Sequence, residues 1–375
     1  MCGISGCVVQ GDGRSPPTDL VAIVDAQNRR GPDSTGYASL AVGAGRTLWL
    51  AHNRLSIIDL TSSANQPMTS HHERYSLVFN GAIYNYVELR EQLLASGYSF
   101  TTQSDTEVLL AALITWGEAA LPRLFGMFTF AFYDALANRL ILARDRFGVK
   151  PLYYRQDGND IWFASTPGAI AGNAGLDPNL EYVGRGIRLK YYEDEGGIAP
   201  FAGICAMPPG HCALIDLGTP SAISPQPYYD LGAAWRLARA DFGQVDRLML
   251  RSELLDRLRN ATMIRLRADV PIGISLSSGV DSTTIAVLCA EAGALPLGFC
   301  FGDPEDDASE APAVRRFAAQ LGQKVRYIPQ ATGQTAKRLF WRTLRAQGAP
   351  FPHTSQIAQY AIFEDARAHG VFAHR

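Results

Sequence analysis

A proline- and glycine-rich segment at residues 203–234 divides this sequence, because such a segment does not continue a sheet or a helix bundle. It contains Pro208, Pro209, Gly210, Gly218, Pro220, Pro225 and Pro227. The chain of 375 residues is long enough for two domains, each with its own core. We therefore expect a first domain over residues 2–205, a linker or domain edge over 206–240, and a second domain over 241–375.

Composition and charge favour a soluble cytoplasmic enzyme. Hydrophobic residues make up 47% of the chain, and the formal net charge of −2 favours neither nucleic acid nor a membrane as a partner. The six cysteines include no CxxC pair and no metal-ligand spacing, which suits free thiols in a reducing cytoplasm. The start, MCGISGCVVQGDG, lacks the basic and apolar regions of a secretion signal.

The two halves differ in their pattern of strands and helices. In the first half, short strand patterns at 2–10, 47–52, 75–80, 127–133 and 139–143 are interleaved with helical patterns at 18–29, 86–96 and 105–116. This mixture predicts a layered α+β domain.

The second half alternates more regularly. A helix over 243–266 is followed by strands at 272–276, 296–301 and 324–329, with helices at 282–292, 310–321 and 354–369. Such alternation predicts a parallel, doubly wound α/β sheet. A further strand is expected to start at Val371–Ala373.

Cys2 is a candidate N-terminal nucleophile. It directly follows the initiator Met, and removal of that Met would free an α-amine with a pKa of roughly 7.7–8.0, able to accept the thiol proton. One residue would then supply both nucleophile and base. On its own, a Met-Cys start fits a buried structural cysteine better, since many proteins begin this way by chance.

Other residues strengthen the case for Cys2. Hydrolysis of an amino-acid amide needs a cation for the substrate carboxylate, an anion for its amine and donors for an oxyanion. Arg54, Asp105 and the pair Asn80-Gly81 could fill these roles. Their alternatives are a surface salt bridge, a cap of the 105–116 helix and a turn.

Taken together, these segments resemble a known family. The motifs are MCGISG, RRGPDSTG, AHNRLSIID, FNGAIYNY, SDTEVLL, GMFTFAFYD and LARDRFGVKPLYY. Their order resembles that of the glutamine-hydrolysing asparagine synthetases, over essentially the whole chain. RLSIID with DRFGVKPLYY favours this family over the sugar-phosphate and phosphoribosyl amidotransferases. The resemblance implies a four-layer αββα sandwich of the N-terminal-nucleophile type, followed by an ATP-pyrophosphatase domain.

The resemblance also implies roles in the first domain. Cys2 would be the nucleophile, Asn80 and Gly81 would form the oxyanion hole, and glutamine would be held by Arg54, Leu55, Ile58 and Asp105. Two positions depart from the family: Ala82 stands where NGE is usual, and Arg29 stands where HRGPD is usual. Losing a charged partner costs about 1.5–3 kcal/mol, so we expect weaker glutamine binding.

The segment SSGVDST at 277–283 is a candidate nucleotide loop between a strand and a helix. Small residues let backbone N–H groups face a phosphate, and the helix N-terminus adds partial positive charge. A plain strand–turn–helix is the alternative. The segment resembles the SGGxDS pyrophosphate loop, with Ser278 in place of the first Gly. That resemblance implies ATP contacts from Leu276, Ser277, Ser278, Gly279, Asp281, Ser282 and Phe301, with Asp281 also binding Mg²⁺.

In the resembled family, ATP activates aspartate as β-aspartyl-AMP, which ammonia converts to asparagine. A homodimer is one assembly that the resemblance leaves open. A second motif (SGEGxDE-like) and a lysine lie downstream in that family, whereas this sequence ends at Arg375. We therefore expect a C-terminally truncated synthetase half, able to bind ATP weakly without making asparagine.

Two alternatives remain open. One is a related enzyme that forms an amide on another carboxylate, closing a β-lactam or peptide ring or amidating a sugar. The other is a protein that only hydrolyses glutamine or acts as a scaffold, with a degenerate second half. The acidic run at 303–310 suggests a metal site, but a loop of solvated charges before a helix accounts for it better.

Overall fold

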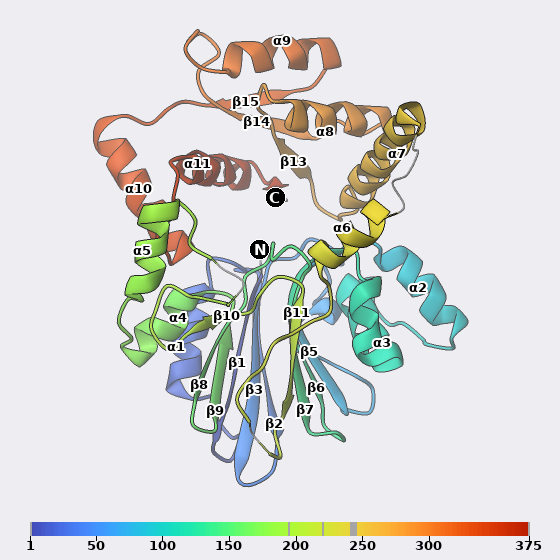
Figure 1. Ribbon diagram of the computed structural model, residues 1–375, viewed down its shortest axis with the longest axis vertical. Helices are drawn as coiled ribbons and strands as arrows, with labels where there is room; N and C mark the ends of the chain where they lie inside the picture. The colour runs from blue at the N-terminus through green and yellow to red at the C-terminus, as the bar shows by residue number, and fades with distance from the viewer. Residues whose placement is uncertain (1, 194–195, 220, 241–245, 374–375) are drawn as a thin grey trace. The chain divides into compact units, whose positions relative to one another are not determined.

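The computed structural model describes residues 2–193, 196–219, 221–240 and 246–373, and it divides into two compact units (Figure 1). The first unit comprises Met1–Arg236 with Gly348–Pro352, and the second comprises Leu237–Gln347 with His353–Arg375. Within the described ranges, no helix combines the length and the apolar character needed to cross a membrane.

The first unit is built on two antiparallel sheets of six strands each. The first has the strand order β10-β8-β9-β1-β3-β2, and the second has the order β12-β11-β7-β6-β5-β4. The strands are β1 (Gly3–Gln10), β2 (Ser34–Ala41), β3 (Arg46–Arg54), β4 (Met68–Thr69), β5 (Tyr75–Ile83), β6 (Gly126–Asp134), β7 (Arg139–Arg144), β8 (Tyr153–Asp157), β9 (Asp160–Ala164), β10 (Cys205–Ala206), β11 (His211–Asp216) and β12 (Gln226–Pro227).

Helices cover the outer faces of both sheets. Helices α1 (Thr18–Gln27) and α4 (Pro167–Ala174) pack on the first sheet, and α2 (Tyr86–Ala95) and α3 (Asp105–Trp116) pack on the second. The remaining elements that begin in this unit are η1 (Ser62–Ala64), η2 (Gly117–Arg123), α5 (Leu180–Leu189) and α6 (Leu231–Ala240). The layer order is therefore αββα, which confirms the predicted fold of this half.

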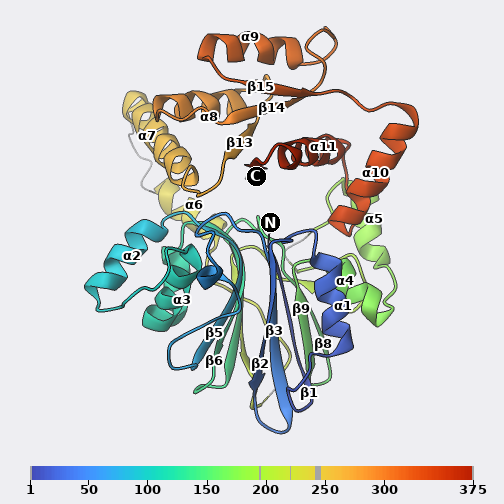
Figure 2. The same cartoon turned by 180° about the vertical axis from the view of Figure 1, so that it is seen from behind.

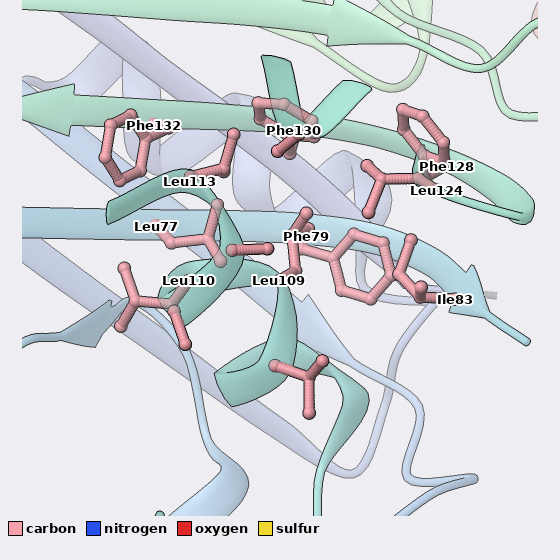
Figure 3. Close-up of a cluster of buried hydrophobic side chains, with 14 of the residues drawn as sticks. Leu77, Phe79, Ile83, Leu109, Leu110, Leu113, Leu124, Phe128, Phe130 and Phe132 are labelled. Carbon is pink, nitrogen blue, oxygen red and sulfur yellow. The ribbon is translucent and has the colours of Figure 1, made fainter. Parts of the chain in front are cut away.

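The strand period of two explains how β5 joins two cores. Val78 faces the other sheet and packs between the sheets with Ile4 and Leu50. Leu77 and Phe79 face the opposite way, against α3, in the cluster drawn in Figure 3. A continuous apolar strand such as this one must be covered on both sides.

The second unit contains a parallel four-stranded sheet of order β15-β14-β13-β16. Helices α8 and α9 pack on one face, whereas α11 packs on the other, as Figure 2 also shows. The sheet is therefore doubly wound, as predicted. The elements are α7 (Arg247–Arg265), β13 (Ile272–Ser275), α8 (Val280–Glu291), β14 (Leu297–Phe301), α9 (Ala311–Leu321), β15 (Val325–Ile328), α10 (Gly333–Gln347), α11 (Ser355–Ala368) and β16 (Phe372–Ala373).

Residues 206–240, expected to be a linker or edge, contain a core strand. Strand β11 pairs with β7 from Cys212 to Asp216, and Ala213 and Ile215 are buried between the sheets. Pro208, Pro209 and Gly210 precede β11 and Gly218 follows it, so the strand itself contains neither residue type. A composition dominated by turn residues thus concealed a short apolar strand.

The motif DRFGVK forms a tight turn after β7 that depends on the buried carboxylate of Asp145. Its Oδ2 accepts hydrogen bonds from the backbone N–H groups of Phe128 (3.2 Å) and Lys150 (2.9 Å). Its Oδ1 accepts from Phe147 (3.1 Å) and Val149 (3.0 Å). One carboxylate therefore satisfies four backbone donors and ties β6 to the turn.

Asp145→Ala should destabilise the first unit by about 3 kcal/mol or more, because it leaves several backbone donors without their acceptor. Urea denaturation followed by circular dichroism measures the change. Asp157→Ala is the matched control, since the Asp157 side chain is 67% exposed in an ion pair with Arg155 and should change stability by less than about 0.5 kcal/mol. Equal stability losses in the two variants would contradict this account.

Candidate active site

The end of strand β5 presents backbone donors at an open edge of its sheet. The N–H of Phe79 donates to Oε1 of Gln66 at 2.6 Å, and the N–H of Ile83 donates to Oδ2 of Asp105 at 2.9 Å. Gly81 lies midway between them and pairs with Phe128 of β6. Because donors alternate along an antiparallel strand, the Gly81 amide points to the same edge as its two neighbours.

Only glycine fits at position 81. A Cβ atom there would lie 2.1 Å from the carbonyl oxygen of Met127 and 2.7 Å from the Cα of Phe128. Both obstacles are backbone atoms of the paired strand, so they cannot move aside as a flexible side chain could. The fit explains why the chain places glycine inside this strand.

The side chain of Asn80 points off the face of the sheet, into the space between the two sheets, and is 1% exposed. Its Nδ2 donates to Oγ of Ser165 at 3.5 Å, and the same Oγ accepts from the N–H of Ile4 at 3.0 Å. Ser165 thus links Asn80 to strand β1, two residues after Cys2. A side-chain amide and a backbone amide therefore lie next to each other in β5.

Cys2 precedes β1 and is held against the end of β3. Its Sγ accepts a hydrogen bond from the N–H of Leu55 at 3.3 Å and lies 3.6 Å from the Leu55 carbonyl oxygen. The Nε–H of Arg30 donates to the carbonyl oxygen of Cys2 at 3.0 Å. Burial lowers the pKa of Arg30 to about 10, so its guanidinium remains charged at neutral pH. These contacts fix both the thiol and the backbone of Cys2.

Asp105 is the first residue of α3, whose N-cap is the Ser104 side chain, bonded to the N–H of Glu107. Burial raises the pKa of Asp105 to about 7, although its bond from the Ile83 N–H acts in the opposite direction. The Cys2 thiol contributes a further, smaller increase. The carboxyl group therefore lies within electrostatic range of Cys2, and its ionisation is less favourable than that of an exposed carboxyl group.

Arg54 at the end of β3 binds the loop that follows it. Its guanidinium donates to the carbonyl oxygen of Asp59, to that of Thr61 at 2.7 Å and to Oδ1 of Asn65 at 2.7 Å. A guanidinium has five N–H donors, so these contacts do not exhaust it. Ile58 is half-buried within the same loop.

The two departures from the family pattern have different environments. Ala82 is 2% exposed, so a carboxylate at this position would be desolvated unless a cation lay beside it. Arg29 is exposed, whereas its neighbour Arg30 contacts Cys2. The substitution at 29 therefore changes a surface position of the motif and leaves its inward contact in place.

In the second unit, the segment between β13 and α8 forms a loop of short side chains. The N–H of Ser277 donates to Oγ of Ser282 at 3.0 Å, and the N–H of Gly279 donates to Oγ of Ser277 at 3.2 Å. Ser278 donates through both its N–H and its hydroxyl to Oε2 of Glu310, each at 3.0 Å. The loop thus holds an anionic oxygen at the N-terminus of α8.

The structure brings together most, but not all, of the predicted nucleotide-binding residues. Leu276 packs under α8 and α9, whereas Phe301 packs on the opposite face of the sheet, beside α11. Asp281 is exposed in the first turn of α8. Among the described residues, no group of three or more His, Cys, Asp and Glu side chains is arranged to hold a metal ion.

Several contributing residues were not predicted. Arg30 contacts Cys2, and Nε2 of His52 lies 3.1 Å from the carbonyl oxygen of Phe79. Both lie inside quoted motifs, RRGPDSTG and AHNRLSIID, but neither was assigned a role from the sequence. Glu310 ends the acidic run, which was interpreted as solvated charge. Gln66 and Ser165 carry no local sequence signal, because each acts on a strand distant in the chain.

Comparison with known proteins gives two family matches along the chain. Residues 1–229 match the model described as "Glutamine amidotransferase domain", and residues 253–374 match the model described as "Asparagine synthase". The chain belongs to the family of glutamine-hydrolysing asparagine synthetases.

Named relatives align with most of the chain. Asparagine synthetase [glutamine-hydrolyzing] 1 of Bacillus subtilis is 29% identical, over 98% of this chain and 56% of that protein. Amidase chry2 of Gibberella zeae is 30% identical, over 100% of this chain and 57% of that protein. The chain thus spans a little more than half the length of these curated relatives.

Among solved structures, the glutamine phosphoribosylpyrophosphate amidotransferase of B. subtilis complexed with ADP and GMP aligns with a TM-score of 0.44 at 15% identity. This alignment covers 93% of this chain and 71% of that one.

The pKa of Asp105 predicts a pH-dependent stability. With its pKa raised from 3.8 to about 7, the folded protein binds more protons than the unfolded chain between these values, so this residue costs stability as pH rises. Asp105→Asn should therefore stabilise the protein increasingly from about pH 4 to pH 8, by up to about 4 kcal/mol. Urea denaturation across this range measures the effect.

Asp134→Asn is the control for this titration, because the partner Arg74 lowers the pKa of Asp134. The stability difference between Asp134→Asn and the wild type should stay constant above about pH 5. A constant difference for Asp105→Asn as well would show that Asp105 titrates normally.

Proposed function

We propose that the first unit is a glutaminase in which Cys2 attacks the side-chain amide of glutamine. The observation that carries this proposal is the edge of β5, where the Gly81 amide lies between Phe79 and Ile83, next to Asn80. Two such donors would stabilise the negatively charged oxygen of a tetrahedral intermediate more strongly than the neutral carbonyl oxygen of the substrate. The contacts between Cys2 and Leu55 support the same assignment.

The proposed reaction has two steps. The Cys2 thiol loses its proton to the α-amine that Met1 removal would free, and the thiolate attacks the amide carbon. Asn80 Nδ2–H and Gly81 N–H stabilise the oxyanion, the C–N bond breaks, and the protonated α-amine returns its proton to the leaving ammonia. Water then hydrolyses the thioester to glutamate and restores the thiol.

Glutamine itself would be held at both ends of its amino-acid group. The remaining N–H groups of Arg54 suit its carboxylate, and Asp105 suits its ammonium group. Leu55 and Ile58 would contact the substrate from the loop after β3. Binding a cation beside Asp105 would relieve the cost of ionising this buried carboxyl.

For the second unit we propose ATP binding at residues 276–282, with Mg²⁺ carried by the nucleotide and bound by Asp281. The loop fits an anionic ligand, because Ser278 already donates two hydrogen bonds to a carboxylate oxygen of Glu310. Ser277, Gly279 and Ser282 would complete the phosphate contacts. Leu276 and Phe301 lie on opposite faces of the sheet, so they would have to contact different parts of the nucleotide. Bound ATP would supply the free energy that activates a carboxylate for amide formation.

For the protein as a whole, the first candidate activity is glutamine-dependent asparagine synthesis, with aspartate as the acceptor. Residues 2–205 would release ammonia and residues 241–375 would contribute to its transfer. The relative named amidase chry2 keeps a second acceptor class open, a different carboxylate amidated by the same chemistry. We propose a cytoplasmic ligase of amino-acid biosynthesis as the first candidate, and a homodimer as its assembly.

Cys2→Ala should lower glutamine-dependent ammonia release at least a thousandfold, because no other residue would form the thioester. Cys205→Ala is the matched control, since Cys205 is a free and exposed thiol in the same unit. A tag retained before Cys2 should be nearly as harmful as Cys2→Ala, because it removes the proposed base. Ammonia release within tenfold of wild type for Cys2→Ala would rule out Cys2 as the nucleophile.

The acceptor is tested by mass spectrometry on the protein expressed from its complete gene, with aspartate, ATP, Mg²⁺ and amide-¹⁵N-glutamine. We expect ¹⁵N-asparagine together with AMP and pyrophosphate. Labelled ammonia without any new amide would indicate a glutaminase alone. If glutamine-dependent ATP cleavage occurs only with a carboxylate other than aspartate, the protein belongs to the second class, in which a different carboxylate is amidated.

A further inference from the structure

A layer of polar side chains ends the apolar core between the two sheets of the first unit. Asn80, Thr129, His52 and Ser165 are each at most 1% exposed. Each lies two residues from an apolar core residue on the same inward face of its strand or just past the strand end: Val78, Ala131, Leu50 and Phe163, respectively. The apolar core therefore gives way to polar groups at the end of the sandwich where β1 begins.

The sheet registers bring these four residues close together. Asn80 and Thr129 are directly paired across β5 and β6, and Ile4 and His52 are directly paired across β1 and β3. Ser165 Oγ bonds both the Ile4 N–H and Asn80 Nδ2, whereas His52 Nε2 lies 3.1 Å from the carbonyl oxygen of Phe79. Two separate links thus join the same ends of the two sheets.

Three buried atoms of this layer have no hydrogen-bond partner among the described residues. They are Nδ1 of His52, Oδ1 of Asn80 and Oγ1 of Thr129. Leaving a buried polar atom unpaired costs about 1–3 kcal/mol, so three neighbouring ones indicate a shared ligand. Buried water molecules commonly fill this role, making two to four hydrogen bonds each.

The protonation of His52 determines which ligand fits. Burial lowers the pKa of His52 to about 3, so the ring is neutral. A carbonyl oxygen only accepts, so the Nε2 next to Phe79 carries the ring proton and Nδ1 is an acceptor. His52 Nδ1 and Asn80 Oδ1 therefore both need a donor, while the Thr129 hydroxyl can donate. One water molecule supplies two donors and accepts one hydrogen bond.

We propose that His52 and Thr129 are positioning residues that hold the Asn80 amide through one buried water molecule. The water donates to Asn80 Oδ1 and His52 Nδ1 and accepts from the Thr129 hydroxyl. This arrangement keeps Nδ2 of Asn80 as the group that remains available to an oxyanion. A flipped amide would place Oδ1 there instead, and two negative oxygens would repel each other. The proposal rests on the proposed glutaminase function.

Thr129→Val tests the proposal with little change in shape. It should lower the kcat of glutamine hydrolysis roughly tenfold, a smaller loss than removing an oxyanion donor outright, and leave KM within about twofold. An aldehyde analogue of glutamine, which forms an oxyanion on Cys2, should lose affinity by the same factor as kcat. Thr129→Ser retains the hydroxyl group and should restore all three values to within about twofold of wild type.

The tautomer of His52 is a second readout that needs no activity. In protein with ¹⁵N-labelled histidine at pH 7, the signal assigned through loss in His52→Gln should show a neutral ring protonated at Nε2. A charged ring, or a proton on Nδ1, would overturn the proposal, because Nδ1 could then donate to Asn80 directly.

The two proposals fail in distinguishable ways. If Cys2→Ala retains ammonia release, the glutaminase assignment fails before Thr129 is considered. If Cys2 is essential but Thr129→Val retains kcat and aldehyde affinity within twofold, only the positioning role is wrong. A Thr129→Val variant with lower kcat and KM raised by the same factor would also overturn it, since general damage to the site would explain both.

Discussion

The alternation of hydrogen bonds along β5 is the constraint on which the candidate site depends. Successive residues of a strand send their side chains to opposite faces and their amides to opposite edges, so Asn80 and Gly81 present different groups in different directions. Pairing with β6 fixes this register, and one residue of slippage would exchange the two. The apolar residues on both faces of β5 therefore hold the position of the site as well as the fold.

Two buried carboxylates of the first unit differ in how fully the fold satisfies them. Asp145 accepts four backbone N–H groups and serves structure alone. Asp105 accepts from Ile83 yet retains a raised pKa, which means that its ionised form is incompletely stabilised. Glu310, by contrast, is an exposed carboxylate that accepts two hydrogen bonds from Ser278 in the candidate nucleotide loop. The fold thus satisfies Asp145 completely, whereas it leaves Asp105 with a carboxylate that is costly to ionise.

Much of this architecture could be predicted from the sequence, since the apolar periods of β5, α3 and the second-unit strands are regular. Core strand β11 was missed because prolines and glycines surround a short segment. At the site, Cys2, Asn80, Gly81 and Asp105 could be named from local motifs. Ser165, Gln66 and Thr129 could not, because their contacts arise only when distant strands pair. Glu310 is exposed, in line with the interpretation of its run as solvated charge, but its contact with Ser278 depends on the packing of α9 beside α8 and could not be predicted.

The open edge of β5 also bears on solubility. Strand β4 covers only Leu77 and Ser76, so the later residues of β5 form a sheet edge of the kind that invites a strand from another molecule. The side chains of Gln66 and Asp105 already accept hydrogen bonds from two of its backbone N–H groups, so these donors are not open to an incoming strand. The residues that shape the candidate site thereby also guard the molecule against edge-to-edge aggregation.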